Sequence, residues 1–185
     1  MNLARRLLGI TVLAWPLTAA TATNGYPLQE AGTDVGNLEL LQRGARNFVN
    51  YCLGCHSARY MRYSQVADDL ALTEYELREN LMFTGTRVYD AMLTSMPADQ
   101  ALQWFGNTPP DLSLIARSRG VDYVYTYLKS FYADPARPTG ANNAVLANTV
   151  MPHVLASLQG VQQPRYGTIA GQDGKPHEHL VGLDP

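Results

Sequence analysis

Cysteine is scarce in this chain, and its two residues, Cys52 and Cys55, lie in one short segment. The sequence therefore offers no disulfide framework that could connect distant parts of the fold. A four-coordinate zinc site would need two more thiolate or imidazole ligands with their own close spacing. There is no third cysteine, and outside the segment only His153, His177 and His179 remain, so the sequence does not favour zinc.

Basic charge and long apolar runs are also limited. The 14 Lys and Arg residues stand against 16 Asp and Glu, which excludes the basic footprint of a nucleic-acid-binding domain. After residue 22 there is no run of about 20 apolar residues, the length that spans a bilayer.

We find no Ser/His/Asp set, phosphate-binding loop or compelling carboxylate pair, so no catalysis of its own is expected. No internal repeat and no convincing pair of alternating strands is present, which predicts a mostly α fold.

The first 22 residues have the composition of a secretory signal peptide. Arg5 and Arg6 supply its charged start, residues 7–15 are apolar, and Ala20–Ala22 provides a small-residue cleavage site. Their removal leaves 163 residues, with 12 basic against 16 acidic side chains and a net charge of −4. That length is enough for one domain with its own core. The sequence therefore predicts an exported, single-domain protein.

The segment Cys52-Leu53-Gly54-Cys55-His56 gives the clearest indication of function. Cys-x-x-Cys-His is the attachment signature of a c-type haem, in which both thiols bind the porphyrin and the histidine binds the iron. A thioredoxin-like redox pair would follow a strand, and no β-branched apolar run precedes Cys52. We expect one covalent haem c with its iron, and a fold of short helices and long loops wrapped around it.

Apolar periodicity predicts a helix whose C-terminal end carries the Cys-x-x-Cys-His segment. The spacing of Leu41, Ala45 and Phe48 puts them on one face of a helix over residues 37–53. Capping residues, prolines and glycines predict where the other helices begin and end. These helices are expected over residues 73–83, 87–96, 98–105, 109–120 and 121–132.

The composition changes after these helices. Residues 133–160 are rich in Pro, Gly and Asn and predict a long functional loop. Residues 161–185 are polar, contain several Gly and Pro residues and have no helical period, so an extended tail is expected. The predicted organisation is a signal peptide over residues 1–22, a haem domain over 23–160 and a tail over 161–185.

The second axial ligand of the iron decides what chemistry the site permits. Met96 and Met151 each precede a proline, which disfavours a helical conformation and suits a ligand carried on a loop. The Pro109-Pro110 pair is suited to pack beside the proximal imidazole, so a distal ligand is expected later in the chain. This order favours Met151, with Met96 and His153 as alternatives.

Polar contacts to the haem are expected from the helices that follow the proline pair. Arg117 and Arg119 lie at a predicted helix end and could bind the haem propionates, because guanidinium groups pair with carboxylates at two points. Tyr123, Tyr125 and Tyr127 cannot all face the same way on a helix, so one or two of them are expected to line the haem pocket.

Several segments together resemble the cytochrome c1 family, the haem subunits of ubiquinol–cytochrome c oxidoreductase (the cytochrome bc1 complex). The similarity covers roughly residues 24–160. It rests on Arg43-Gly44, on CLGCHSARY over residues 52–60, on PPDLSLIARSR over residues 109–119 and on DYV over residues 122–124. The Pro-Pro-Asp-Leu-Ser run distinguishes this family better than Cys-x-x-Cys-His alone.

The resemblance implies roles for particular residues. His56 and Met151 would be the axial ligands of the haem iron, and Cys52 and Cys55 the thioether anchors. Contacts to the haem would come from Pro110, Arg119 and Tyr123.

The resemblance also implies partners and a location. The protein would take one electron from the Rieske iron–sulfur protein and pass it to a soluble cytochrome c. It would lie beside cytochrome b on the periplasmic face of the bacterial inner membrane.

One feature departs from the family pattern. Its members end in a helix that crosses the first haem helix and continues as a membrane anchor, and residues 161–185 have no counterpart to it. We expect a truncated sequence. The alternatives are a free periplasmic c-type cytochrome serving another redox chain, and a haem enzyme or sensor with an open distal position.

Overall fold

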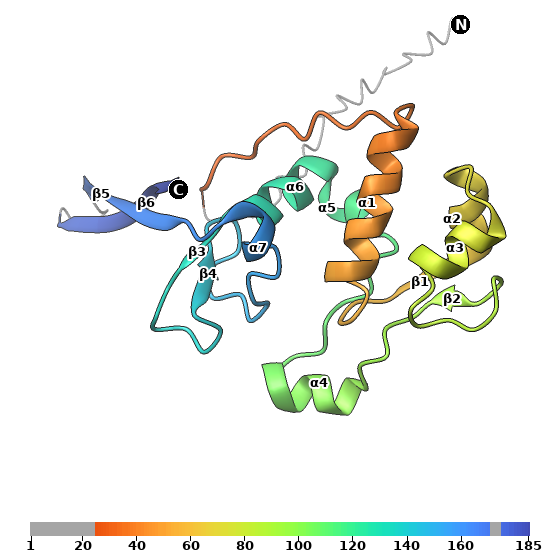
Figure 1. The fold of residues 1–185 in the computed structure, drawn as a ribbon. Coiled ribbons are helices and arrows are strands. Elements are labelled where there is room, and N and C mark those ends of the chain that lie inside the picture. Colours follow the sequence, from red (N-terminus) through yellow and green to blue (C-terminus); the bar gives the residue numbers. More distant parts are fainter. Residues whose placement is uncertain (1–24, 171–174) are drawn as a thin grey trace, which may run out of the picture.

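The computed structural model describes residues 25–170 and 175–185, and the predicted signal peptide lies outside these ranges. Figure 1 shows the arrangement of the elements. The helices in the described residues are α1 (Leu38–Tyr51), α2 (Tyr63–Asp69), α3 (Glu74–Asn80), α4 (Ala98–Phe105), α5 (Ile115–Arg119), α6 (Val121–Lys129) and α7 (Ala156–Gln159). The strands are β1 (Ala58–Arg62), β2 (Ala91–Met92), β3 (Phe131–Ala133), β4 (Ala141–Asn143), β5 (Gln163–Ala170) and β6 (Pro176–Asp184).

The expectation of a mostly α fold is wrong. The structure is 35% helical and 19% strand, and its strands form three two-stranded antiparallel sheets, β1–β2, β3–β4 and β5–β6. The largest sheet pairs residues 163–170 with residues 176–184, in the segment expected to be an extended tail. Both faces of β6 are largely exposed, so its sequence carries no alternation of apolar and polar residues that would predict a strand.

Helix α1 forms where the apolar spacing predicts it. The Asn37 side chain caps its N-terminus by accepting a hydrogen bond from the backbone N–H of Leu40 at 3.1 Å. Val49 is buried, while Phe48 and other apolar residues on the same side pack against the neighbouring core. The helix ends at Tyr51, so Cys52 directly follows its last residue.

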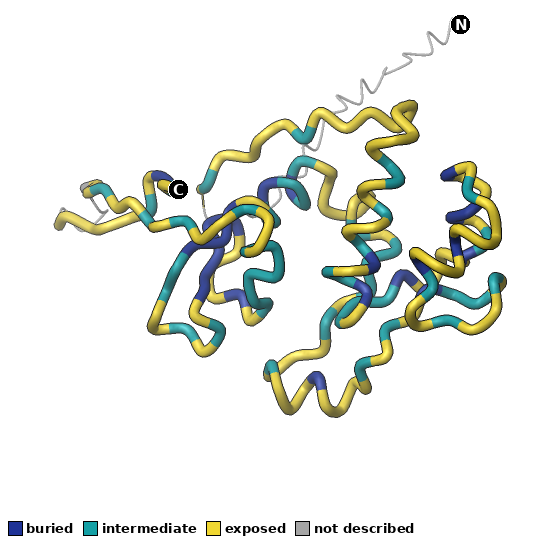
Figure 2. Tube along the Cα trace, in the orientation of Figure 1, coloured by how far each residue is buried: buried dark blue, intermediate teal, exposed yellow. Residues whose placement is uncertain are grey.

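Most buried residues form two separate groups, seen among the dark blue segments in Figure 2. The first group joins α1 to α2, α3 and β2, and Tyr63 at its centre has no exposed surface. The Tyr63 ring packs on Gly85, where an added Cβ would lie 2.6 Å from the ring carbon Cε2. The Tyr63 hydroxyl is also hydrogen-bonded to Thr84 Oγ1 at 2.9 Å, which fixes the loop after α3.

The second buried group joins α6 to β3 and β4. Asn143 at its centre is 1% exposed, and both polar atoms of its side-chain amide are hydrogen-bonded. Its Oδ1 accepts from the backbone N–H groups of Val145 at 2.9 Å and Leu146 at 3.0 Å, and its Nδ2 donates to the Tyr127 carbonyl at 2.7 Å. This buried amide holds the start of the segment between β4 and α7 against α6.

The described N-terminal segment lies along α6 before the chain enters α1 (Figure 1). The backbone N–H of Gln29 donates to Thr126 Oγ1 at 2.8 Å, and that of Ala31 donates to Asp122 Oδ1 at 2.8 Å. These contacts join residues that are more than 90 positions apart in the sequence.

The other predicted helices differ in outcome. Helix α4 coincides with the predicted range 98–105, and α3 begins with the predicted capping box at Thr73. The helix predicted over residues 87–96 is wrong, because Ala91 and Met92 pair with β1 instead. Residues 109–113 precede α5 and are not helical, and residues 131–132 belong to β3. Within the described residues, no helix combines the length and apolar character needed to cross a bilayer.

Candidate haem site

The Cys-x-x-Cys-His segment forms a tight turn at the end of α1. The backbone N–H groups of Cys55 and His56 both donate to the Cys52 carbonyl, at 3.0 and 2.8 Å. Both cysteines are free and partly buried, and burial raises the pKa of each thiol, with the nearby Cys55 adding to the effect at Cys52. The turn therefore carries two unpaired thiols and an imidazole within five residues, the donor set that haem attachment needs.

The orientation of His56 is fixed by a neighbouring loop. Its Nδ1 lies 2.8 Å from the carbonyl oxygen of Pro110. A carbonyl can only accept a hydrogen bond, so Nδ1 is the donor of this contact, and in the neutral imidazole Nε2 then carries a lone pair. Neutral histidines that bind metals commonly donate their other ring N–H to a backbone carbonyl in this way. The contact thus selects the neutral tautomer in which Nε2 is available to a metal.

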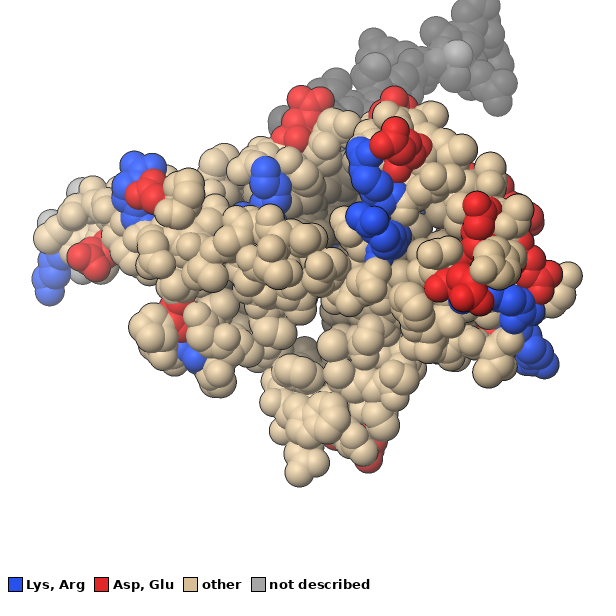
Figure 3. Space-filling view, in the orientation of Figure 1, with Lys and Arg blue, Asp and Glu red and all other residues tan. Residues whose placement is uncertain are grey.

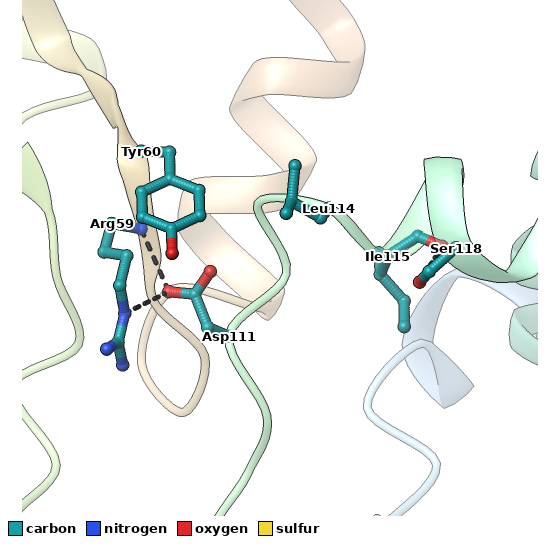
Figure 4. A pocket seen from close by; sticks show the side chains of 6 residues that line it. All are labelled: Arg59, Tyr60, Asp111, Leu114, Ile115 and Ser118. Carbon is teal, nitrogen blue, oxygen red and sulfur yellow. Dashed lines mark hydrogen bonds and ion pairs between the residues drawn. The ribbon is translucent and has the colours of Figure 1, made fainter.

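The loop that carries Pro110 is joined to the strand that follows His56. The backbone N–H of Leu112 donates to the Ser57 carbonyl at 2.8 Å, and that of Tyr60 donates to Ser113 Oγ at 3.1 Å. Figure 4 shows the pocket beside this junction, where the Asp111 carboxylate points towards Arg59. The pocket is lined by Arg59, Tyr60, Asp111, Leu114, Ile115 and Ser118.

Met151 lies in the segment between β4 and α7, and its sulfur is close to α6. The hydroxyl of Tyr127 is 3.5 Å from Met151 Sδ and 2.9 Å from Thr149 Oγ1. Met96 instead lines a small pocket with Cys55 and Pro109, on the side of the loop that carries Pro110. The two methionines are therefore in different surroundings, and Met151, which is half-buried, lies beside the second buried group through its contact with Tyr127.

A row of aromatic rings runs from α6 to the residues after Met151. Tyr123 stacks on Tyr127 at 6.3 Å between ring centroids, and Tyr127 meets Phe131 edge-on at 5.2 Å. Phe131 then stacks on His153 at 5.2 Å. Within the described part of the chain the buried Nε2 of His153 has no hydrogen-bond partner, and burial lowers the pKa of this imidazole. The rings form a continuous aromatic cluster in which Tyr123 and Phe131 are buried.

The arginines expected near the propionates lie at the end of α5. The Arg119 guanidinium is 5.5 Å from the centroid of the Tyr123 ring, so a cation–π contact connects it to the aromatic row. Tyr123 itself is buried, while Arg117 and Arg119 are exposed. The structure thus places Arg119 beside the row.

The space-filling view shows an opening through the molecule (Figure 3). It is bordered by the end of α1, by α4 and by the segment between β4 and α7, which can be followed in Figure 1. The end of α1 leads into the free thiols of Cys52 and Cys55 and the oriented His56 imidazole, and the segment between β4 and α7 carries the Met151 thioether. These residues fit a covalently attached haem.

Comparison with known proteins decides the family. The model of the Cytochrome C1 family matches residues 34–178. The chain belongs to the cytochrome c1 family.

Two curated relatives show how far the similarity extends. The chain is 48% identical to cytochrome c1 of Allochromatium vinosum over 160 residues, which cover 86% of this chain and 66% of that protein. It is 42% identical over 163 residues to the ammonia monooxygenase gamma subunit of Nitrosomonas europaea, covering 88% of this chain and 69% of that protein. The chain therefore spans about two thirds of the length of the curated relatives it matches.

Membership of the cytochrome c1 family confirms the resemblance and the cofactor. Proteins of this family bind one covalent haem c with its iron and belong to electron transport. Sequence analysis named Tyr127 only as one of three candidate pocket tyrosines and chose Tyr123 from the family resemblance, whereas the hydroxyl of Tyr127 reaches the Met151 sulfur. The four-residue spacing of these tyrosines already put them on one side of a helix, so the pair could have been treated together.

Proposed function

We propose that this chain is the haem-bearing, one-electron carrier subunit of a cytochrome bc1 complex. It receives an electron from the Rieske iron–sulfur protein and delivers it to a soluble cytochrome c. The family match over residues 34–178 and the 48% identity to a cytochrome c1 support this assignment. The bound haem iron supplies a reversible one-electron couple.

The residues of the attachment turn would hold the proximal side of the haem. Cys52 and Cys55 would form the thioether bonds, and His56 would bind the iron through Nε2 while its Nδ1–H donates a hydrogen bond to the Pro110 carbonyl. The single observation that carries the proposal is this 2.8 Å contact beside two free thiols, since it fixes both the tautomer and the direction of the ligand.

The other side of the haem would be held by residues beside the second buried group. Met151 would supply the second protein ligand to the iron, and the aromatic row beginning at Tyr123 would support it. Arg119, which lies above Tyr123, would bind a propionate. With both axial positions filled by protein side chains, the site transfers electrons and has no position open to substrate.

The organisation of the chain follows from this role. Residues 1–22 would direct export, residues 23–160 form the haem domain, and residues 161–185 lie outside it. The protein would act on the periplasmic face of the inner membrane, in contact with cytochrome b. This location supplies the haem-attachment machinery, which acts on exported chains.

Haem attachment is tested by producing the chain in a host that matures c-type cytochromes. The mature protein should gain the mass of one haem, keep it under denaturing conditions and have no titratable thiol. Replacement of both Cys52 and Cys55 by Ser should abolish the covalent mass. A colourless wild-type protein with two free thiols would refute the proposal.

The place in the complex is tested by isolating the tagged, haem-loaded chain from membranes. Co-purification with cytochrome b and a Rieske protein supports the bc1 assignment, whereas recovery of the chain alone in the periplasmic fraction would favour a free cytochrome. The remaining alternative is a haem enzyme or sensor with an open distal position, and carbon monoxide binding to the reduced protein tests it. Carbon monoxide should bind an open distal site rapidly and a methionine-ligated iron poorly.

A further inference from the structure

The loop that presents a carbonyl to His56 has an unusual lack of backbone donors. Pro109 and Pro110 have no N–H group, so neither residue can fix the loop by donating a backbone hydrogen bond. The Pro110 carbonyl nevertheless lies 2.8 Å from His56 Nδ1. The hydrogen bonds that join this loop to the strand after His56 come from the residues that follow the two prolines.

The side chain of Asp111 accepts two of the four hydrogen bonds that join this loop to residues 57–60. Its Oδ2 accepts from the backbone N–H of Arg59 at 3.0 Å and from the guanidinium Nε of Arg59 at 3.1 Å, as Figure 4 shows. Its Oδ1 accepts from the backbone N–H of Ser113 at 3.0 Å. One carboxylate thus connects the proline loop to β1, three residues after His56 in the sequence.

The Asp111 carboxylate is charged throughout the neutral range. Desolvation alone would raise its pKa, but hydrogen bonds from Ser113 and Arg59 outweigh this effect and lower the pKa to about 2. Only 19% of the side chain is exposed, so few water molecules compete for its oxygens.

We infer that Asp111 is a positioning residue for the proximal ligand: by tying the proline loop to β1 it fixes the Pro110 carbonyl against His56 Nδ1. The inference rests on the proposed function of His56 as an iron ligand. A well-fixed hydrogen bond to Nδ1 makes the imidazole a stronger donor through Nε2. A stronger donor favours the ferric state, so loosening this contact should raise the reduction potential.

The test compares Asp111→Asn with the wild type, both carrying covalent haem. Each protein is equilibrated with a reference redox couple, and the ratio of reduced to oxidised protein is measured. This ratio should be roughly fivefold higher in Asp111→Asn, which corresponds to the typical net free energy of one hydrogen bond. The proton NMR signals of the His56 ring should shift at the same time. A purely structural role for Asp111 would lower thermal stability without moving either property.

Asp90→Asn is the matched control. The Asp90 carboxylate accepts from the backbone N–H of Arg87 at 2.9 Å and from its Nε at 2.9 Å, as Asp111 does with Arg59. It fixes the turn before β2, which has no contact with the Pro110 carbonyl among the described hydrogen bonds. This variant should lose stability while its redox equilibrium and His56 signals stay as in the wild type.

The outcomes are distinct. Unchanged redox equilibrium and His56 signals in Asp111→Asn would overturn the inference, as would equal shifts in Asp90→Asn. If Asp111→Asn fails to mature, Arg59→Gln is measured instead, because it removes the Nε contact and keeps the backbone contact. A smaller shift in the same direction supports the inference, and no shift refutes it. Failure of the proposed function would look different, since the wild type would then carry no covalent haem.

Discussion

The hydroxyl of Tyr127 lies 3.5 Å from the sulfur of Met151 and is held there by Thr149 Oγ1 at 2.9 Å. Thr149 is buried, and the Tyr127 ring is packed between Tyr123 and Phe131. The hydroxyl can therefore turn little, and one of its two polar neighbours is the proposed iron ligand. A hydrogen bond to this sulfur should therefore affect the reduction potential of the haem, which can be measured.

Replacement of Tyr127 by Phe should lower the reduction potential of the haem-loaded protein. A hydroxyl that donates to the Met151 sulfur withdraws electron density from it, and its loss makes the thioether a better ligand for ferric iron. The change should not exceed about 1 kcal/mol of redox free energy. Tyr125→Phe is the control, because the Tyr125 hydroxyl contacts Lys129 and should leave the potential unchanged. A potential in Tyr127→Phe equal to that of the wild type would contradict the prediction.

Replacement of Met151 by Leu should remove the sulfur-to-iron absorption band at the red end of the ferric spectrum. The reduced variant should then bind carbon monoxide readily, because leucine has no atom that can occupy the axial position. Met96→Leu should keep the band and bind carbon monoxide as poorly as the wild type, since Met96 lies with Cys55 and Pro109. If Met96→Leu loses the band and Met151→Leu keeps it, the proposed ligand assignment is wrong.

Acid should remove the stabilising effect of Asp90. Hydrogen bonds from the backbone N–H groups of Arg87 and Thr86 lower the pKa of its carboxyl to about 2. The unfolded chain titrates at about 3.9, so the contribution is present above that pH and is lost as the pH falls towards 2. Wild type and Asp90→Asn should therefore differ in melting temperature at pH 7 and converge near pH 2. A difference of constant size over this range would show that the carboxylate charge is not involved.

Gly85→Ala should destabilise the fold through a steric clash with Tyr63. The new Cβ would lie 2.6 Å from Cε2 of a fully buried ring, so the ring or the loop must move, at a cost of about 1–3 kcal/mol. Gly44→Ala is the matched control, because nothing lies within 4 Å of its Cβ position in the middle of α1. Alanine should stabilise that helix by roughly 0.5–1 kcal/mol. Urea unfolding of both variants measures the two free energies, and equal changes in both would contradict the predicted clash.

Local signals in the sequence predict those elements whose stability is local. The Asn37 cap and apolar spacing predict α1, the Thr73 capping box predicts α3, and Pro97 marks the start of α4. By contrast, Ala91 and Met92 resemble a helix segment and become a strand because β1, some 30 residues earlier, offers them a partner. Residues 109–113 stay out of a helix because their polar groups bond to Ser57, Arg59 and Tyr60.

The same distinction holds for the candidate site. The thiols and the imidazole occur together in five residues, so the sequence alone identifies them. The Tyr127 contact with Met151 depends on how α6 is rotated about its axis, which packing against β3 and β4 determines. The role of Asp111 depends on a pairing across 52 residues that no periodicity in the sequence indicates.

The attachment of the N-terminal segment to α6 has a consequence for the order of folding. Ribosomes and export channels release a chain from its N-terminus, yet Gln29 and Ala31 reach their partners only when Thr126 and Asp122 have emerged. Contacts of such high sequence separation close slowly, because loop entropy must be overcome first. The attachment turn at Cys52 and His56 is therefore synthesised and displayed well before this segment can dock, which leaves both thiols reachable by a maturation enzyme while the surrounding protein is still assembling.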